Sequence, residues 1–204
     1  MGNRSYLCTS NVETLYPGRS DPEFDDKLQV IAGGSYTVPL LWMALFRPAN
    51  MRSQRFEIDG ESVLAQGPVV EKSVGLKQLA QAIPVVNRLF STEGQVDEYA
   101  ALLRSAIADA KGRYITIELD EIAALSDDDD GFYQKFTDAL GSFEIERPID
   151  ADRTRFLEIT EIEPHARFPP PRFLITGETA TDDQIANHSR LLGAKWTMSL
   201  PWDP

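Results

Sequence analysis

The chain has 204 residues with 32 Asp and Glu against 20 Lys and Arg, so its formal net charge at pH 7 is −12. Binding to nucleic acid needs clustered Lys and Arg to neutralise phosphates, so this charge argues against it and favours a basic protein partner instead. Solubility alone also explains an acidic charge. The apolar fraction of 42% is ordinary for a folded protein, and the length fits one globular domain spanning residues 1–204.

The beginning of the chain and its apolar runs argue against secretion and membrane insertion. Residues 1–6 lack the basic-then-apolar order of a secretory signal, and Tyr6 stands where the myristoylation pattern needs Ser or Thr. No apolar run approaches the roughly 20 residues that cross a bilayer. The single cysteine, Cys8, cannot form an internal disulfide, which agrees with a reducing compartment. We expect a cytoplasmic protein with no membrane contact and with Cys8 packed in the core.

The first half of the chain predicts a strand, a core helix and a hairpin. Residues 38–46 form the densest apolar stretch and predict a short buried helix. Pro39 suits its first turn, and Pro48 lies just after its end. Asp59-Gly60 between two alternating runs is a hairpin signal. The remaining segments are predicted as a strand over residues 4–9, a turn-rich region over 11–34 with a short helix over 23–31, a turn at 32–35, and hairpin strands over 52–58 and 62–66.

The second half alternates helices with strands. Apolar residues recur at threes and fours over 95–110, the clearest helix, and the β-branched run over 113–119 predicts a strand in the centre of a sheet. Other predictions are a helix from residue 73 that Pro84 ends or kinks, a helix over 132–140 capped by Ser126, strands over 156–162, 173–176 and 195–200, and a helix between Thr181 and Gly193. This order predicts an α+β fold, a single mixed domain with a sheet of about five to seven strands and packed helices.

The opening Met-Gly-Asn-Arg-Ser-Tyr-Leu-Cys resembles that of an uncharacterised group of bacterial proteins that begin Met-x-Asn-Arg-Ser-Tyr-Leu-Tyr. Those proteins are similar in placing a short proline-started apolar segment further along, as residues 38–42, Val-Pro-Leu-Leu-Trp, do here. The resemblance covers about the first quarter of the chain and departs from the group at Cys8. It implies a bacterial protein and carries no activity with it.

Four consecutive aspartates are the strongest candidate for a binding site, namely Asp127, Asp128, Asp129 and Asp130. Aligned with an EF-hand loop through Gly131, the run has Ser126 at the first position and Thr137 at the twelfth, so two ligating carboxylates are missing. Three explanations stay open: a solvated helix start, where the helix dipole favours acids, an acidic surface that binds a partner, and a metal site. We take the four aspartates as partner-binding residues and expect no metal or cofactor.

Candidate catalytic residues are few. The two histidines, His165 and His188, have no zinc-site spacing, and the chain lacks the Gly-x-Ser-x-Gly motif. Residues 32–35 lack the Lys of a phosphate-binding loop. The acids Glu118, Asp120 and Glu121 follow the best predicted strand, a position that α/β enzymes use for catalysis. Acids at that position also simply mark the strand leaving the core.

These observations favour a non-enzymatic, cytoplasmic, bacterial interaction protein. Its concrete form would be an immunity-type protein that neutralises a basic toxin domain through acidic surface residues, with electrostatic attraction raising the association rate. The alternative is a small hydrolase or transferase in which the acids at the strand end assemble with one of the two histidines.

Overall fold

The computed structural model describes residues 4–15, 28–58, 60–90, 95–126, 129–144, 150–163, 165–169, 171, 180–193 and 195–196. An antiparallel sheet runs through the molecule in the strand order β3-β4-β5-β1-β2-β6. Its strands are β1 (Arg4–Ser10), β2 (Leu28–Ser35), β3 (Met51–Ile58), β4 (Glu61–Glu71), β5 (Tyr114–Glu118) and β6 (Lys195–Trp196). β5 lies between β4 and β1, so the prediction of a central strand is confirmed.

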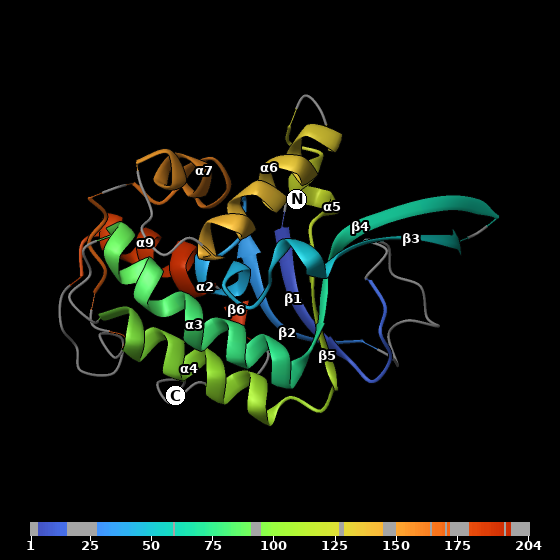
Figure 1. Ribbon diagram of the computed structural model, residues 1–204, viewed down its shortest axis with the longest axis horizontal. Helices are drawn as coiled ribbons and strands as arrows, with labels where there is room; N and C mark the ends of the chain where they lie inside the picture. The colour runs from blue at the N-terminus through green and yellow to red at the C-terminus, as the bar shows by residue number, and fades with distance from the viewer. Residues whose placement is uncertain are drawn as a thin grey trace.

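Helices pack against the sheet and the predicted α+β fold is confirmed (Figure 1). In the described residues the α-helices are α2 (Leu40–Met43), α3 (Lys72–Phe90), α4 (Gln95–Asp109), α5 (Asp120–Ala123), α6 (Asp129–Gly141), α7 (Asp150–Thr160) and α9 (Asp182–Leu192), and the 3-10 turns are η1 (Pro48–Asn50) and η2 (Ser142–Glu144). Within the described ranges, no helix has both the length and the apolar character needed to cross a membrane. The capping box of Thr181 with Gln184 confirms the predicted start of α9.

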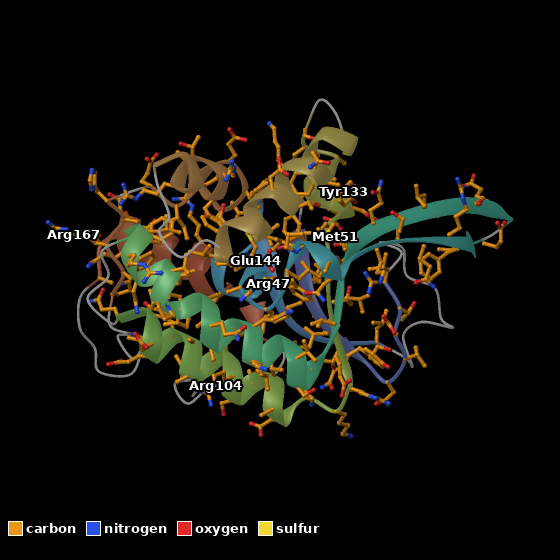
Figure 2. All side chains as sticks on the ribbon, viewed as in Figure 1. Arg47, Met51, Arg104, Tyr133, Glu144 and Arg167 are labelled. Carbon is orange, nitrogen blue, oxygen red and sulfur yellow. The ribbon has the colours of Figure 1, made fainter. Side chains whose placement is uncertain are left out.

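The apolar stretch 38–46 lies at the centre of the molecule, as predicted, although its helix α2 is only four residues long. The indole N–H of Trp42 donates a hydrogen bond to the Leu192 carbonyl oxygen at 2.9 Å. Arg47 follows the stretch, is itself buried, and donates to the Phe46 and Gln78 carbonyl oxygens. Figure 2 shows Arg47 in the interior of the molecule beside Glu144. The stretch therefore satisfies its buried polar groups through contacts far away in the sequence.

Two predictions for the region 23–35 are wrong. Residues 28–31 belong to strand β2, and the rest of the predicted helix lies outside the described residues. Gly33 and Gly34 lie within β2 instead of in a turn. A Cβ atom on Gly34 would stand 2.5 Å from the Ser5 hydroxyl oxygen, so the glycine is needed because β1 and β2 approach closely there.

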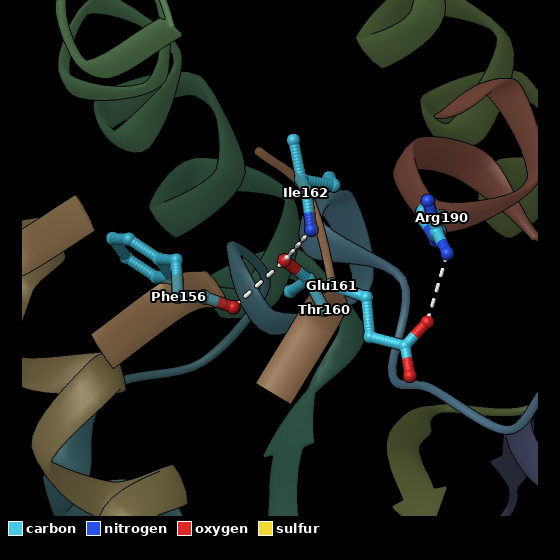
Figure 3. Close-up of polar contacts among 5 residues, drawn as sticks. All are labelled: Phe156, Thr160, Glu161, Ile162 and Arg190. Carbon is cyan, nitrogen blue, oxygen red and sulfur yellow. Dashed lines mark hydrogen bonds and ion pairs between the residues drawn. The ribbon is translucent and has the colours of Figure 1, made fainter. Parts of the chain in front are cut away.

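The predicted strand over 156–162 is also wrong, because residues up to Thr160 belong to helix α7. Phe156, Ile159 and Thr160 are buried and have the spacing of one helix face. The Thr160 hydroxyl donates to the Phe156 carbonyl oxygen at 2.7 Å and accepts the Ile162 amide at 3.2 Å (Figure 3). Glu161 then adopts a φ of 54° and ends the helix, while its carboxylate pairs with Arg190 of α9 at 2.9 Å.

One predicted helix end, at Pro84, is wrong. Pro84 was predicted to end or kink the helix, and it does not end it: α3 continues through Pro84, and the flanking Ile83, Val85 and Val86 are buried on both sides of it. The described part of α6 begins at Asp129, and residues 127 and 128 lie outside the described ranges, so the predicted cap by Ser126 stays a prediction. The Ser126 hydroxyl donates to the Ala123 carbonyl oxygen at 2.8 Å, just after α5. The predicted strand over 173–176 and the residues after Trp196 lie outside the described part of the chain.

Replacement of Trp42 by Ala should destabilise the protein strongly. The side chain is fully buried and its N–H is hydrogen-bonded, so we expect Trp42→Ala to lower the free energy of unfolding by about 3–5 kcal/mol in urea titrations. Ile185 of α9 is 44% exposed, and Ile185→Ala is the control with an expected loss below about 1 kcal/mol. Equal losses for the two variants would show that α2 is not the centre of the core.

Candidate functional site

Three acids lie where the chain leaves β5 and enters α5. Glu118, the last residue of β5, is 2% exposed, and its Oε1 accepts the backbone N–H of Asp120 at 2.8 Å. Its other carboxyl oxygen, Oε2, is buried and has no hydrogen-bond partner among the residues that the structure describes. Burial, followed by the negative charge of Asp120, raises the pKa of Glu118 to about 8. Glu118 is therefore mostly protonated and neutral at pH 7.

Asp120 and Glu121 of α5 accept hydrogen bonds from α6 and β1. The Tyr133 hydroxyl of α6 donates to Asp120 Oδ1 at 2.7 Å, and the backbone N–H of Arg4 in β1 donates to Glu121 Oε2 at 2.9 Å. Asp120 is half-buried and Glu121 is exposed. Because Tyr133 lies one helical turn after Asp129, the bond to Asp120 brings α5 next to the first turn of α6.

We call Asp120, Glu121, Asp129 and Asp130 the acidic corner. Of the four aspartates predicted to bind a partner, Asp129 and Asp130 open helix α6, whereas Asp127 and Asp128 lie outside the described residues. Acidic residues at this position are favoured by the positive end of the helix dipole, by about 0.3–1 kcal/mol each. The described residues contain no group of three His, Cys, Asp or Glu side chains arranged to hold a metal ion.

The histidines lie away from these acids. His188 is on α9, which Figure 1 places at the opposite end of the molecule from α5. Its Nδ1 is 3.2 Å from the Tyr99 hydroxyl, which itself donates to the Pro169 carbonyl oxygen at 2.6 Å. Since the hydroxyl hydrogen is used there, Nδ1 carries a hydrogen and donates to Tyr99. Burial lowers the pKa of His188 to about 4, so the ring is a neutral link between α4 and α9.

His165 lines a polar cavity of about 490 Å³ with residues of α9, among them Asn187 and Arg190. The cavity lies at the end of the molecule that holds α9, so His165 does not join the strand-end acids. Cys8 is fully buried, as predicted, and burial raises the pKa of its thiol, which keeps it protonated and unreactive.

A second cavity, of about 230 Å³, lies beside the acidic corner. We call it the hairpin groove, because α6 forms one wall and the base of the β3–β4 hairpin forms the other. It is lined by Met51, Arg52, Ser53, Gln66, Tyr133, Gln134 and Thr137. Figure 2 shows Tyr133 and Met51 on neighbouring elements at this point. The sequence predicted both walls and held no signal that they come together.

No family model, curated protein or solved structure matches this chain. Its function is therefore inferred from the chain's own residues. The α5–α6 region combines a buried neutral acid, surface acids held by hydrogen bonds and a polar groove. Glu118 is too deeply buried to touch a substrate, and no histidine lies beside it to relay a proton.

The neutral state of Glu118 should make stability depend on pH. Its pKa is raised from 4.5 to about 8 on folding, so the folded state holds a proton that the unfolded state has lost over this interval. The group's stabilising contribution is complete below pH 4.5 and is lost as pH rises through about 8, with a slope of about 1.4 kcal/mol per pH unit.

Glu118→Gln mimics the protonated acid. We expect it to remove this slope and to raise the free energy of unfolding, measured by urea titration, at alkaline pH. Glu121→Gln is the matched control, because Glu121 is exposed and should leave the slope unchanged. Parallel pH profiles for wild type and Glu118→Gln would show that Glu118 is ionised in the folded protein.

Proposed function

We propose that this chain is a non-enzymatic, cytoplasmic bacterial protein that binds a basic protein partner through its acidic corner. The concrete form of the proposal is an immunity-type protein that neutralises a basic toxin domain. The observation that carries it is the hydrogen bond between Tyr133 and Asp120, which gathers the acids of α5 and the first turn of α6 in one place. The net charge of −12 and the resemblance of the first residues to a group of bacterial proteins support it.

The alternative, a hydrolase or transferase built on Glu118, Asp120 and Glu121, finds less support. Such an enzyme needs a base or nucleophile that reaches its substrate. Glu118 is neutral and buried, and the Asp120 carboxylate is already bonded to Tyr133. His188 is neutral, buried and bonded to Tyr99. These side chains have structural partners in place of the free reactive groups that catalysis requires.

Binding through surface charge has a kinetic signature. Exposed charges attract an oppositely charged partner over a distance that salt shortens to about 10 Å at 0.1 M. Attraction of this kind accelerates association more than it strengthens the final complex. A partner that binds at the acidic corner should therefore associate quickly at low salt and slowly at high salt.

The test begins with capture of a basic partner from the native host at low salt, followed by measurement of its association rate with purified variants. Neutralising two acids at the start of α6, in Asp129→Asn/Asp130→Asn, should slow association at low salt by about tenfold. The matched control, Glu98→Gln/Asp109→Asn, removes the same charge from exposed positions on α4 and should have a much smaller effect. Failure to recover a protein partner, an affinity indifferent to salt, or equal effects of the two double variants would contradict the proposal.

A further inference from the structure

Strand β3 is an edge of the sheet. In the described part of the chain it pairs only with β4, and the tip of the hairpin that the two strands form extends away from the helices (Figure 1). β4 pairs with β5 only over residues 69–71, so the rest of the hairpin is an arm of two strands. A two-stranded arm is marginally stable alone, and its unpaired edge can accept another strand.

The register of the hairpin shows which backbone groups of β3 point away from β4. Ile58 and Glu61 flank the two-residue turn and therefore form a hydrogen-bonded pair. Bonded and non-bonded pairs alternate along an antiparallel ladder, so the N–H and C=O groups of Arg55 and Glu57 point outward from the edge. A strand added along β3 would bond to these groups.

The side chains of Arg55 and Glu57 lie on the same face of the hairpin, because alternate residues of a strand share a face. Both are exposed, and β4 places the uncharged Leu64 opposite Arg55 and Ser62 opposite Glu57. Neither Arg55 nor Glu57 forms an ion pair or a side-chain hydrogen bond within the described residues. The hairpin itself therefore leaves one positive and one negative charge unmatched, side by side on its edge strand.

A second copy of β3 matches both charges in one register. Two identical strands that pair antiparallel about a two-fold axis make every contact twice. With the axis at Phe56, Arg55 of each copy lies opposite Glu57 of the other, and these two residues are also the ones whose backbone groups are free to exchange hydrogen bonds. With the axis moved to Arg55 or to Glu57, that residue faces its own copy, and like charges directly opposite are unfavourable.

The same register joins the apolar faces of the two hairpins. Phe56 lies at the axis in a non-bonded pair, the kind in which side chains come closest. It belongs to a small core, separate from the main one, that consists of Leu15, Phe56, Ile58, Ala65 and Val69. Pairing would make the cores of the two copies continuous and turn two two-stranded arms into one four-stranded sheet, which has the strand number that independent stability needs.

We propose that two copies of this chain associate through the β3 edge, antiparallel about a two-fold axis at Phe56, with reciprocal pairs of Arg55 and Glu57. The inference goes beyond the proposed function and does not depend on it. In this register Ile58 lies opposite Gln54, so the tip of one hairpin stops before turn η1 of the other. The contact is confined to one strand of each copy, so the dimer is weak, with a Kd of about 10 μM.

The test measures the dimer Kd of the full chain by sedimentation at 0.15 M salt, at which repulsion between two acidic copies is screened beyond about 8 Å. Arg55→Glu and Glu57→Arg each place like charges opposite one another twice, and each should raise the Kd by about tenfold or more. The matched control, Arg104→Glu, makes the same charge change at an exposed position of α4 and should leave the Kd unchanged.

Two further samples restore the opposite charges. The double variant Arg55→Glu/Glu57→Arg should dimerise as the wild type does. An equal mixture of Arg55→Glu and Glu57→Arg should form a heterodimer, because every charged pair between these two chains is then of opposite sign. Loss of dimer in a single variant through misfolding would not be rescued in this way, so the rescue separates the proposed pairing from a defect in folding.

Three results would overturn the proposal. The first is a wild-type chain that stays monomeric at about 100 μM. The second is an equal Kd for the wild type and both single reversals, which would place any dimer contact elsewhere, for example along β4. The third is the absence of a heterodimer from the mixture of the two single variants.

Discussion

The burial of residues 38–46 is the constraint on which the rest of the structure depends. A four-residue helix has most of its backbone groups unpaired by its own turn, and burying them without partners would be costly. The chain supplies partners from elsewhere. The Val38 amide donates to the Ile159 carbonyl oxygen at 3.3 Å, the Trp42 indole N–H donates to the Leu192 carbonyl oxygen, and the Arg47 guanidinium donates to the Gln78 carbonyl oxygen. Segments distant in sequence are thereby fixed around α2.

The same stretch positions both walls of the hairpin groove. Immediately after Arg47, turn η1 leads into β3 at Met51, so the end of the apolar stretch sets the start of the hairpin. Arg47 also lies 5.6 Å from the ring centre of Phe143 in η2, which follows α6 directly. A cation–π contact of this kind is worth about 0.5–2 kcal/mol. The core thus contributes to the position of both walls of the groove.

Local signals predicted much of the fold. The Asp59-Gly60 hairpin, the helix after residue 95 and the central strand before Glu118 each follow from turn chemistry or periodicity within one segment. The failures come from contacts that the local sequence does not encode. Gly33 and Gly34 read as a turn, yet both lie in β2, where Gly34 leaves room for the Ser5 side chain of β1. Pro84 predicts a helix end or a kink, yet α3 continues through it between buried residues.

The candidate site was predictable only in part for the same reason. The acids were visible as residues, but their grouping depends on Tyr133 reaching Asp120, a contact that only the folded chain creates. The groove is harder still to predict from the sequence, because several strands and helices separate its walls, β3 and α6, along the chain. No periodicity within either element predicts that they face each other.

The state of Glu118 explains how so many acids can share one corner. Three ionised carboxylates within four residues would repel one another, and one of them would lie in the interior without a counter-charge. A neutral Glu118 removes the buried charge, while its Oε1 still accepts the Asp120 amide and orders the start of α5. Asp120 and Glu121 then keep their negative charge where solvent reaches them. The corner thus places its charge at the surface, which is where the proposed binding of a cationic partner requires it.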